Sequence, residues 1–206
     1  MTQYKPRRPA QLELEQIELI EGGVDTAVSS ELAHTAAQAV VPLKTSHELD
    51  SEIISRVQTL IAEEGIDTLA EAWVTSPETS LPGILWRGYL LREWIRRYSE
   101  DVTLRFAGAA QHFKDIDPQR LELVLNPERV QLLWDEVFRG NFTGDFCNVL
   151  RASARFLDFI GSLAPIWIAD DEHPLATVVT RRDTALLRTA QEFRGAGEAL
   201  VKNNLV

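Results

Sequence analysis

Two arginines on apolar helix faces are the side chains in this sequence best suited to bind another molecule. The stretch from Ser80 to Tyr98 reads SLPGILWRGYLLREWIRRY and predicts one helix. At about 100° per residue, the apolar arc of this helix consists of Ile84, Trp86, Leu90, Leu91, Trp94, Ile95 and Tyr98. Arg87 lies near the middle of that arc, and Arg182 projects from the apolar face of the last predicted helix. An unpaired guanidinium is costly to bury, so each arginine needs a carboxylate, a path to solvent or an anionic ligand.

Two interpretations of these arginines stay open. Arg87 and Arg182 could converge on a carboxylate or phosphate ligand, because the planar guanidinium fork matches both groups. Alternatively, each could form a structural ion pair or reach solvent along the edge of the core. Candidate internal partners are Asp145 and acids in earlier elements, such as Glu71. The pattern favours the ion pair, and it makes Arg87, Arg182 and Asp145 the candidate ligand site.

The other side of the same helix predicts a contact surface. Leu85 and Tyr89 share the polar side with Arg92 and Arg96, so we expect these residues to be open to a partner protein or a second copy. A nucleic-acid surface would need aromatic and basic side chains together on one exposed side. Most of the aromatic residues lie on the apolar arc instead, so DNA binding through a helix-turn-helix is the weaker alternative.

No group of residues has the spacing of a catalytic or metal site. His112, Asp115 and Asp117 are close in sequence, as are residues 170–173, but neither set has ligands at i and i+4 on an established helix face. Cys147 lies among apolar residues, which is typical of a buried side chain rather than a nucleophile. We therefore predict no catalytic residue, no metal and no cofactor, and the sequence favours a protein that is not an enzyme.

Charge is distributed unevenly along the 206 residues, whose formal net charge is −10. Residues 1–10 carry three basic residues and no acid, whereas residues 11–79 carry fourteen acids against Lys44 and Arg56. An acidic surface repels phosphate backbones and attracts basic partners. No apolar run approaches the ~20 residues that a membrane helix needs, and a single cysteine fits a reducing compartment. We expect a soluble cytoplasmic protein that does not bind membranes.

Helical periodicity dominates the chain and predicts a single-domain, all-α, multi-helix bundle of seven to nine helices with no sheet. Residues 1–10 predict a disordered basic tail, and residues 11–206 the helical domain, in which the acidic part 11–79 precedes the helices of 80–206. A capping box at Thr45 and Glu48 starts one helix, and Asn126 followed by proline starts another. Predicted helices cover about residues 11–20, 31–41, 49–61, 67–74, 81–98, 102–113, 127–137, 142–163 and 174–202, with a short turn after Pro118. The 81–98 helix and the last helix are expected at the centre.

Three segments resemble a small, uncharacterised all-helical family common in actinobacteria. They are SLPGILWRGYLLREWIRR from Ser80, FTGDF at 142–146 and VTRRDTALLRTAQEF at 179–193. The resemblance extends from about residue 24 over most of the chain. It implies a cytosolic all-α protein and brings no catalytic residues with it.

These observations favour a non-enzymatic, cytosolic helical interaction or regulatory module. Its acidic N-terminal third would meet a protein partner, or the chain would self-associate through Leu85 and Tyr89. The alternatives are a protein that binds a small anionic ligand through Arg87 and Arg182, and a transcription-associated DNA-binding protein.

Overall fold

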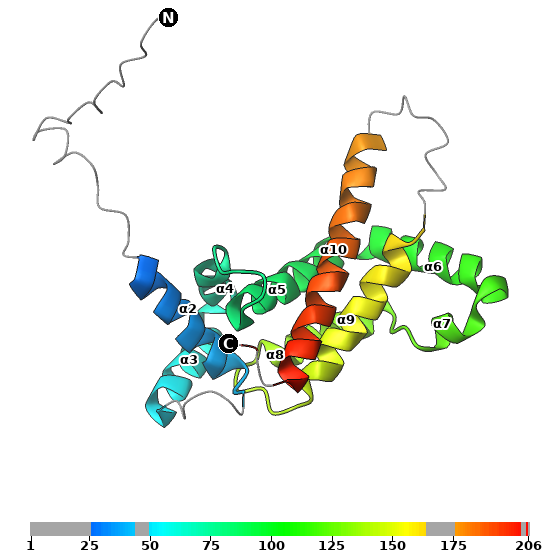
Figure 1. Cartoon of the computed structure of the whole chain (residues 1–206). Helices are drawn as coiled ribbons and strands as arrows, with labels where there is room; N and C mark the ends of the chain where they lie inside the picture. The colour runs from blue at the N-terminus through cyan, green and yellow to red at the C-terminus, as the bar shows by residue number, and fades with distance from the viewer. Residues whose placement is uncertain (1–25, 44–49, 164–175, 203–204, 206) are drawn as a thin grey trace, which may run out of the picture.

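A computed structural model describes residues 26–43, 50–163, 176–202 and 205; at 26–27 and 176–183 it describes the helical backbone alone. Within these ranges the chain is helical and forms no strand (Figure 1), which confirms the all-α prediction, and the number of helices lies within the predicted seven to nine. The predicted tail 1–10 and the predicted helix at 11–20 lie outside the described residues. The helices are α2 (Thr26–Val40), α3 (Ser51–Glu64), α4 (Asp67–Trp73), α5 (Leu81–Arg97), α6 (Ser99–Ile116), α7 (Pro118–Glu122), α8 (Pro127–Val137), α9 (Phe146–Gly161) and α10 (Ala176–Val201).

Side-chain caps explain where several of these helices begin. Asn126 accepts a hydrogen bond from the backbone N–H of Arg129 at 2.9 Å, and Pro127 follows it, so α8 starts where the sequence predicts. Asp117 caps α7 in the same way, and Ser80 caps α5. The start of α3 differs from the prediction: its cap is Asp50, and the predicted capping box of residues 45–48 lies outside the described residues.

Helix α9 begins at Phe146 rather than at Phe142 because the preceding loop packs against α2. Gly140 and Asn141 have φ values of 85° and 49° and reverse the chain after α8. The N–H groups of Asn141 and Phe142 then donate to the carbonyls of Ala39 and Val40 at 3.0 and 2.8 Å. These bonds satisfy carbonyls at the C-terminus of α2, so the loop residues bond to α2 and do not extend α9.

Helix α5 lies at the centre, as predicted, and contacts α2, α4, α6, α8 and α10. Its close approach to α8 depends on Gly88, where a Cβ would lie 2.1 Å from a ring carbon of Trp134. Trp134 is fully buried, and its indole N–H donates to Ser153 of α9 at 2.9 Å. The central role predicted for the last helix is shared with α9, along which α10 packs most extensively (Figure 1).

The two ends of the bundle are built from different helices. Figure 1 shows α2, α3 and α4 at one end and the α6–α7 pair at the other, with α5, α8, α9 and α10 between them. The largest fully buried side chains include Trp73, Trp134, Phe156, Phe159 and Phe193. Among the described residues, no helix has the length and apolar character needed to cross a bilayer.

Candidate functional site

Arg87 forms ion pairs within the protein. Its Nε donates to Glu192 of α10 at 2.9 Å, and its Nη2 lies 3.7 Å from the Glu78 carboxylate in the loop before α5. Arg188 of α10 contacts the same two carboxylates, Glu78 at 2.6 Å and Glu192 at 3.0 Å. Two arginines therefore balance two glutamates, and the Arg188 guanidinium holds the pKa of Glu78 below its ordinary value. Of the two interpretations, the structural ion pair describes Arg87.

The other two residues of the predicted ligand site do not join Arg87 in the described structure. Asp145 is the exposed N-cap of α9 and accepts from the Asn148 N–H at 3.1 Å, so it is not the partner of Arg87. It lines a separate cavity of about 560 Å³ beside α2 and the end of α10. Arg182 belongs to α10, but its side chain lies outside the described residues. Its convergence with Arg87 stays a prediction.

The predicted contact surface on α5 is wrong at Leu85. Leu85 is 0% exposed, whereas Leu90 and Tyr98, which were expected to face the core, are 47% and 51% exposed. The reason is that α5 packs against several helices, so its buried surface is wider than one arc and is rotated from the expected direction. Tyr89 is half-buried: its ring stacks on Trp86 and its hydroxyl donates to Asp67 at 2.9 Å. Burial, together with the Asp67 carboxylate, raises the pKa of Tyr89 to about 12.

Arg92 and Arg96 belong to an ion cluster that was not predicted from the sequence. We call it the Glu93 cluster; its members are Glu93, Arg92, Arg96 and Arg97 of α5 and Asp135 of α8. The Glu93 side chain is only 8% exposed, and its carboxylate lies 2.6 to 3.0 Å from nitrogens of the three arginines. Hydrogen bonding from Arg96 lowers the pKa of Glu93, although burial opposes that shift. The spacing of Glu93 from Arg96 and Arg97, i to i+3 and i+4, was the available signal.

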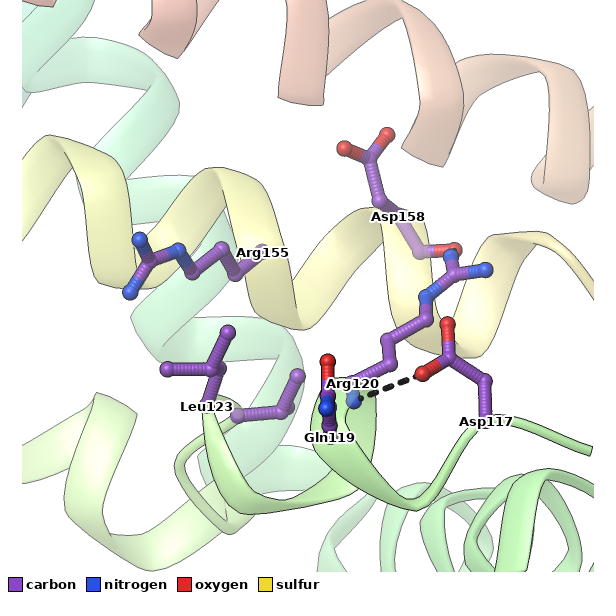
Figure 2. A pocket seen from close by; sticks show the side chains of 7 residues that line it. Asp117, Gln119, Arg120, Leu123, Arg155 and Asp158 are labelled. Atoms are coloured by element: carbon purple, nitrogen blue, oxygen red, sulfur yellow. Dashed lines mark hydrogen bonds between the residues drawn. The ribbon is translucent and has the colours of Figure 1, made fainter. Parts of the chain in front are cut away.

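A cleft between α7 and α9 is lined by two arginines that the sequence did not connect. We call it the α7–α9 cleft; its volume is about 420 Å³, and it is lined by Asp117, Gln119, Arg120, Leu123, Val124, Arg155 and Asp158 (Figure 2). Arg120 packs over the Phe113 ring, with its guanidinium carbon 4.5 Å from the ring centroid. Arg155 makes no ion pair or hydrogen bond through its side chain with any residue the structure describes.

The described residues contain no group of three or more histidine, cysteine, aspartate or glutamate side chains that could hold a metal ion. His112, Asp115 and Asp117 form no such group, and residues 170–173 lie outside the described ranges. Cys147 is half-buried, with its sulfur 3.8 Å from the carbonyl oxygen of Gly197.

Comparison with protein-family models, with curated proteins and with solved structures finds no match for the chain. The resemblance to an actinobacterial helical family therefore stays a prediction.

Proposed function

We propose that the protein is a non-enzymatic, cytoplasmic interaction or regulatory module that binds a basic protein partner at the end formed by α2, α3 and α4. The observation that carries this proposal is the exposure of α3. This helix has apolar residues at three- and four-residue intervals, yet none of its residues is buried. Those apolar side chains are only half-covered by α2 and α4: Ile53, Ile54, Val57, Leu60 and Ile61.

The charge of this end selects the class of partner. Between residues 26 and 79, the described acids are all exposed: Glu31, Asp50, Glu52, Glu63, Glu64, Asp67, Glu71 and Glu78. Arg56 is the one basic residue described there, and Glu52 already pairs with it at 2.6 Å. Val28, Leu32 and Val74 add exposed apolar side chains on α2 and just after α4. Apolar side chains framed by acids complement a segment that carries lysines or arginines around an apolar stripe.

The surface of α5 lends less support to the DNA-binding alternative. Arg92, Arg96 and Arg97 share the Glu93 carboxylate, so much of their charge is already neutralised before any phosphate could approach. The acidic end would also repel a polyanion. Self-association through the apolar side chains of α3 is the alternative to a basic partner, and the following experiment distinguishes the two.

Photo-crosslinking in cells tests the proposal. A photoreactive amino acid replaces Ala62, which is exposed on α3, and in a matched control it replaces Ala107, which is exposed on α6 at the other end. We expect position 62 to capture a protein with a basic segment and position 107 not to capture it. Adducts containing two copies of this chain would contradict the basic partner in favour of self-association, and equal capture at both positions would contradict the site.

Charge reversal supplies the second arm of the same experiment. Glu63→Lys changes an exposed glutamate in the last turn of α3, and Glu136→Lys changes an exposed glutamate in the last turn of α8. Both substitutions are expected to leave the fold intact, because lysine is favourable near a helix C-terminus. We expect Glu63→Lys to lower the capture at position 62 several-fold and Glu136→Lys to leave it unchanged. Capture that survives Glu63→Lys would contradict a charge-selected partner.

A further inference from the structure

We propose that the α7–α9 cleft binds a small amphipathic monocarboxylate, whose carboxylate pairs with Arg155 and whose apolar part lies on Leu123 and Val124. This site is distinct from the acidic end and does not depend on the proposed partner. Figure 2 shows the Arg155 side chain above Leu123, whereas the Arg120 side chain of α7 extends in the opposite direction, toward the carbonyl oxygen of Asp158.

The Arg120 guanidinium is fixed at the side of the cleft away from Arg155. Its Nη2 donates to the carbonyl oxygen of Asp158 at 3.1 Å and to the Ser162 hydroxyl at 3.2 Å, and both acceptors are neutral. Its guanidinium carbon lies over the Phe113 ring. The Nε and Nη1 groups have no acceptor among the described residues. Arg120 is therefore held in place by neutral acceptors, and its guanidinium is not directed to the same point as that of Arg155.

Both carboxylates that line the cleft already have partners. Asp117 accepts from the backbone N–H of Arg120 at 3.1 Å and so caps α7. The Asp158 carboxylate pairs with Arg194 of α10, and Figure 2 shows it turned toward α10 and away from Arg155. Neither carboxylate neutralises a guanidinium inside the cleft. The two carboxylates and the two guanidinium groups of the lining balance in formal charge, but no lining carboxylate pairs with Arg155, so this side chain is available to an anion.

The lining also limits what kind of anion fits. Leu123 is 58% exposed, although it lies in a concave site beside Val124, so an apolar group placed there would cover hydrocarbon that water now contacts. Asp117 and Asp158 lie near enough to disfavour a dianion such as phosphate more than a monoanion. A carboxylate also matches the bidentate geometry of guanidinium. An aliphatic or aryl monocarboxylate satisfies all three conditions.

Calorimetric titration of the full chain with sodium octanoate tests this inference. We expect saturable binding by the wild-type protein, no binding of octanol or inorganic phosphate, and an approximately tenfold weaker octanoate affinity for Arg155→Gln, which corresponds to ~1.4 kcal/mol. The matched control is Arg151→Gln, one helical turn earlier on α9, which is exposed and does not line the cleft. It should bind octanoate as the wild type does.

A second variant tests the apolar part of the cleft, formed by Leu123 and Val124. Leu123→Ala should weaken octanoate binding several-fold while leaving acetate binding unchanged, because acetate has no chain to lay on that side chain. The inference is overturned if octanoate does not bind the wild type, if Arg155→Gln and Arg151→Gln bind it equally, or if phosphate binds more tightly than octanoate. Because Arg155 and Leu123 are exposed, these variants are expected to fold, and circular dichroism of each one verifies this before titration.

Discussion

The Glu93 cluster and the α7–α9 cleft both contain arginines on helix surfaces, but they differ in whether carboxylates reach them. In the Glu93 cluster, one nearly buried carboxylate serves three guanidinium groups, and Asp135 adds a second contact to Arg92 at 2.5 Å. In the α7–α9 cleft, Arg120 has only neutral acceptors, and Arg155 has none among the described residues. The difference indicates that the arginines of the Glu93 cluster stabilise the fold and that Arg155 of the cleft is available to an anion.

Gly88→Ala should have the largest effect, because it separates the helices that carry the Glu93 cluster. The added Cβ would meet the buried Trp134 ring at 2.1 Å, and α5 would have to move away from α8 and from Asp135. We expect the free energy of unfolding to fall by about 3 kcal/mol, at the upper end for overpacking. Urea denaturation of wild type and Gly88→Ala measures this difference in unfolding free energy.

The control for this substitution is Gly108→Ala on α6, where a Cβ meets no atom within 4 Å. Alanine should be neutral or stabilise the helix there by up to about 1 kcal/mol. Equal losses at the two glycines would contradict the close α5–α8 contact.

Glu93→Gln tests the Glu93 cluster directly. It removes the negative charge shared by three arginines while keeping the shape of the side chain. We expect a loss of about 2 kcal/mol of unfolding free energy, below the range for a fully buried pair, because Arg96 and Arg97 can turn to solvent. Asp117→Asn is the comparison in the cleft, where the carboxylate caps a helix but pairs with no guanidinium. A loss no greater in Glu93→Gln than in Asp117→Asn would contradict the role of the cluster.

The dependence of stability on pH should separate wild type from Glu93→Gln. The folded protein holds the pKa of Glu93 below its ordinary value of 4.5, so above that pH the ionised form contributes stability. As the pH falls below about 4.5, the unfolded chain takes up a proton at this position before the folded chain does. We expect wild-type stability to fall more steeply than that of Glu93→Gln across this acidic range, as measured by urea denaturation at each pH. If the unfolding free energies of wild type and Glu93→Gln fell in parallel with pH, the lowered pKa of Glu93 would be contradicted.

Local signals in the sequence predicted most of the fold. Asn126 with Pro127 predicted the start of α8, and helical periodicity predicted a helix at 67–74, where α4 extends from Asp67 to Trp73. These features depend on residues within a few positions of each other, so periodicity and capping preferences describe them. Leu85 was misplaced because a helical wheel assumes one buried face, and α5 has several neighbours.

The candidate sites could be predicted less well because their contacts join distant parts of the chain. The inward direction of Arg87 followed from its position on α5, but its partners Glu192 and Glu78 come from α10 and a loop. Nothing in the sequence places Arg120 and Arg155 in the lining of one cleft, since that arrangement arises from the packing of α7 and its neighbours against α9. Ion pairing within one helix, as at Glu93, was the contact that spacing alone could have revealed.

Arg155→Gln should have the smallest effect on stability. Because this guanidinium has no partner in the described structure, we expect its removal to change the unfolding free energy by less than about 0.5 kcal/mol. Arg92→Gln, in contrast, removes a guanidinium that pairs with Glu93 and Asp135. We expect it to lower the free energy of unfolding by measurably more. Urea denaturation of the two variants measures both losses of unfolding free energy. A larger loss for Arg155→Gln than for Arg92→Gln would contradict the distinction between the cleft and the Glu93 cluster.

Arginine modification by phenylglyoxal, read residue by residue by peptide mass spectrometry, tests the central distinction most directly. Arg96 and Arg97 are 52% and 62% exposed but pair with Glu93, whereas Arg155 is exposed and pairs with no described carboxylate. If carboxylate pairing decides availability, Arg155 reacts several-fold faster than Arg96 and Arg97, and octanoate slows the reaction at Arg155 alone. Equal rates at the three residues, with no protection by octanoate, would contradict the account.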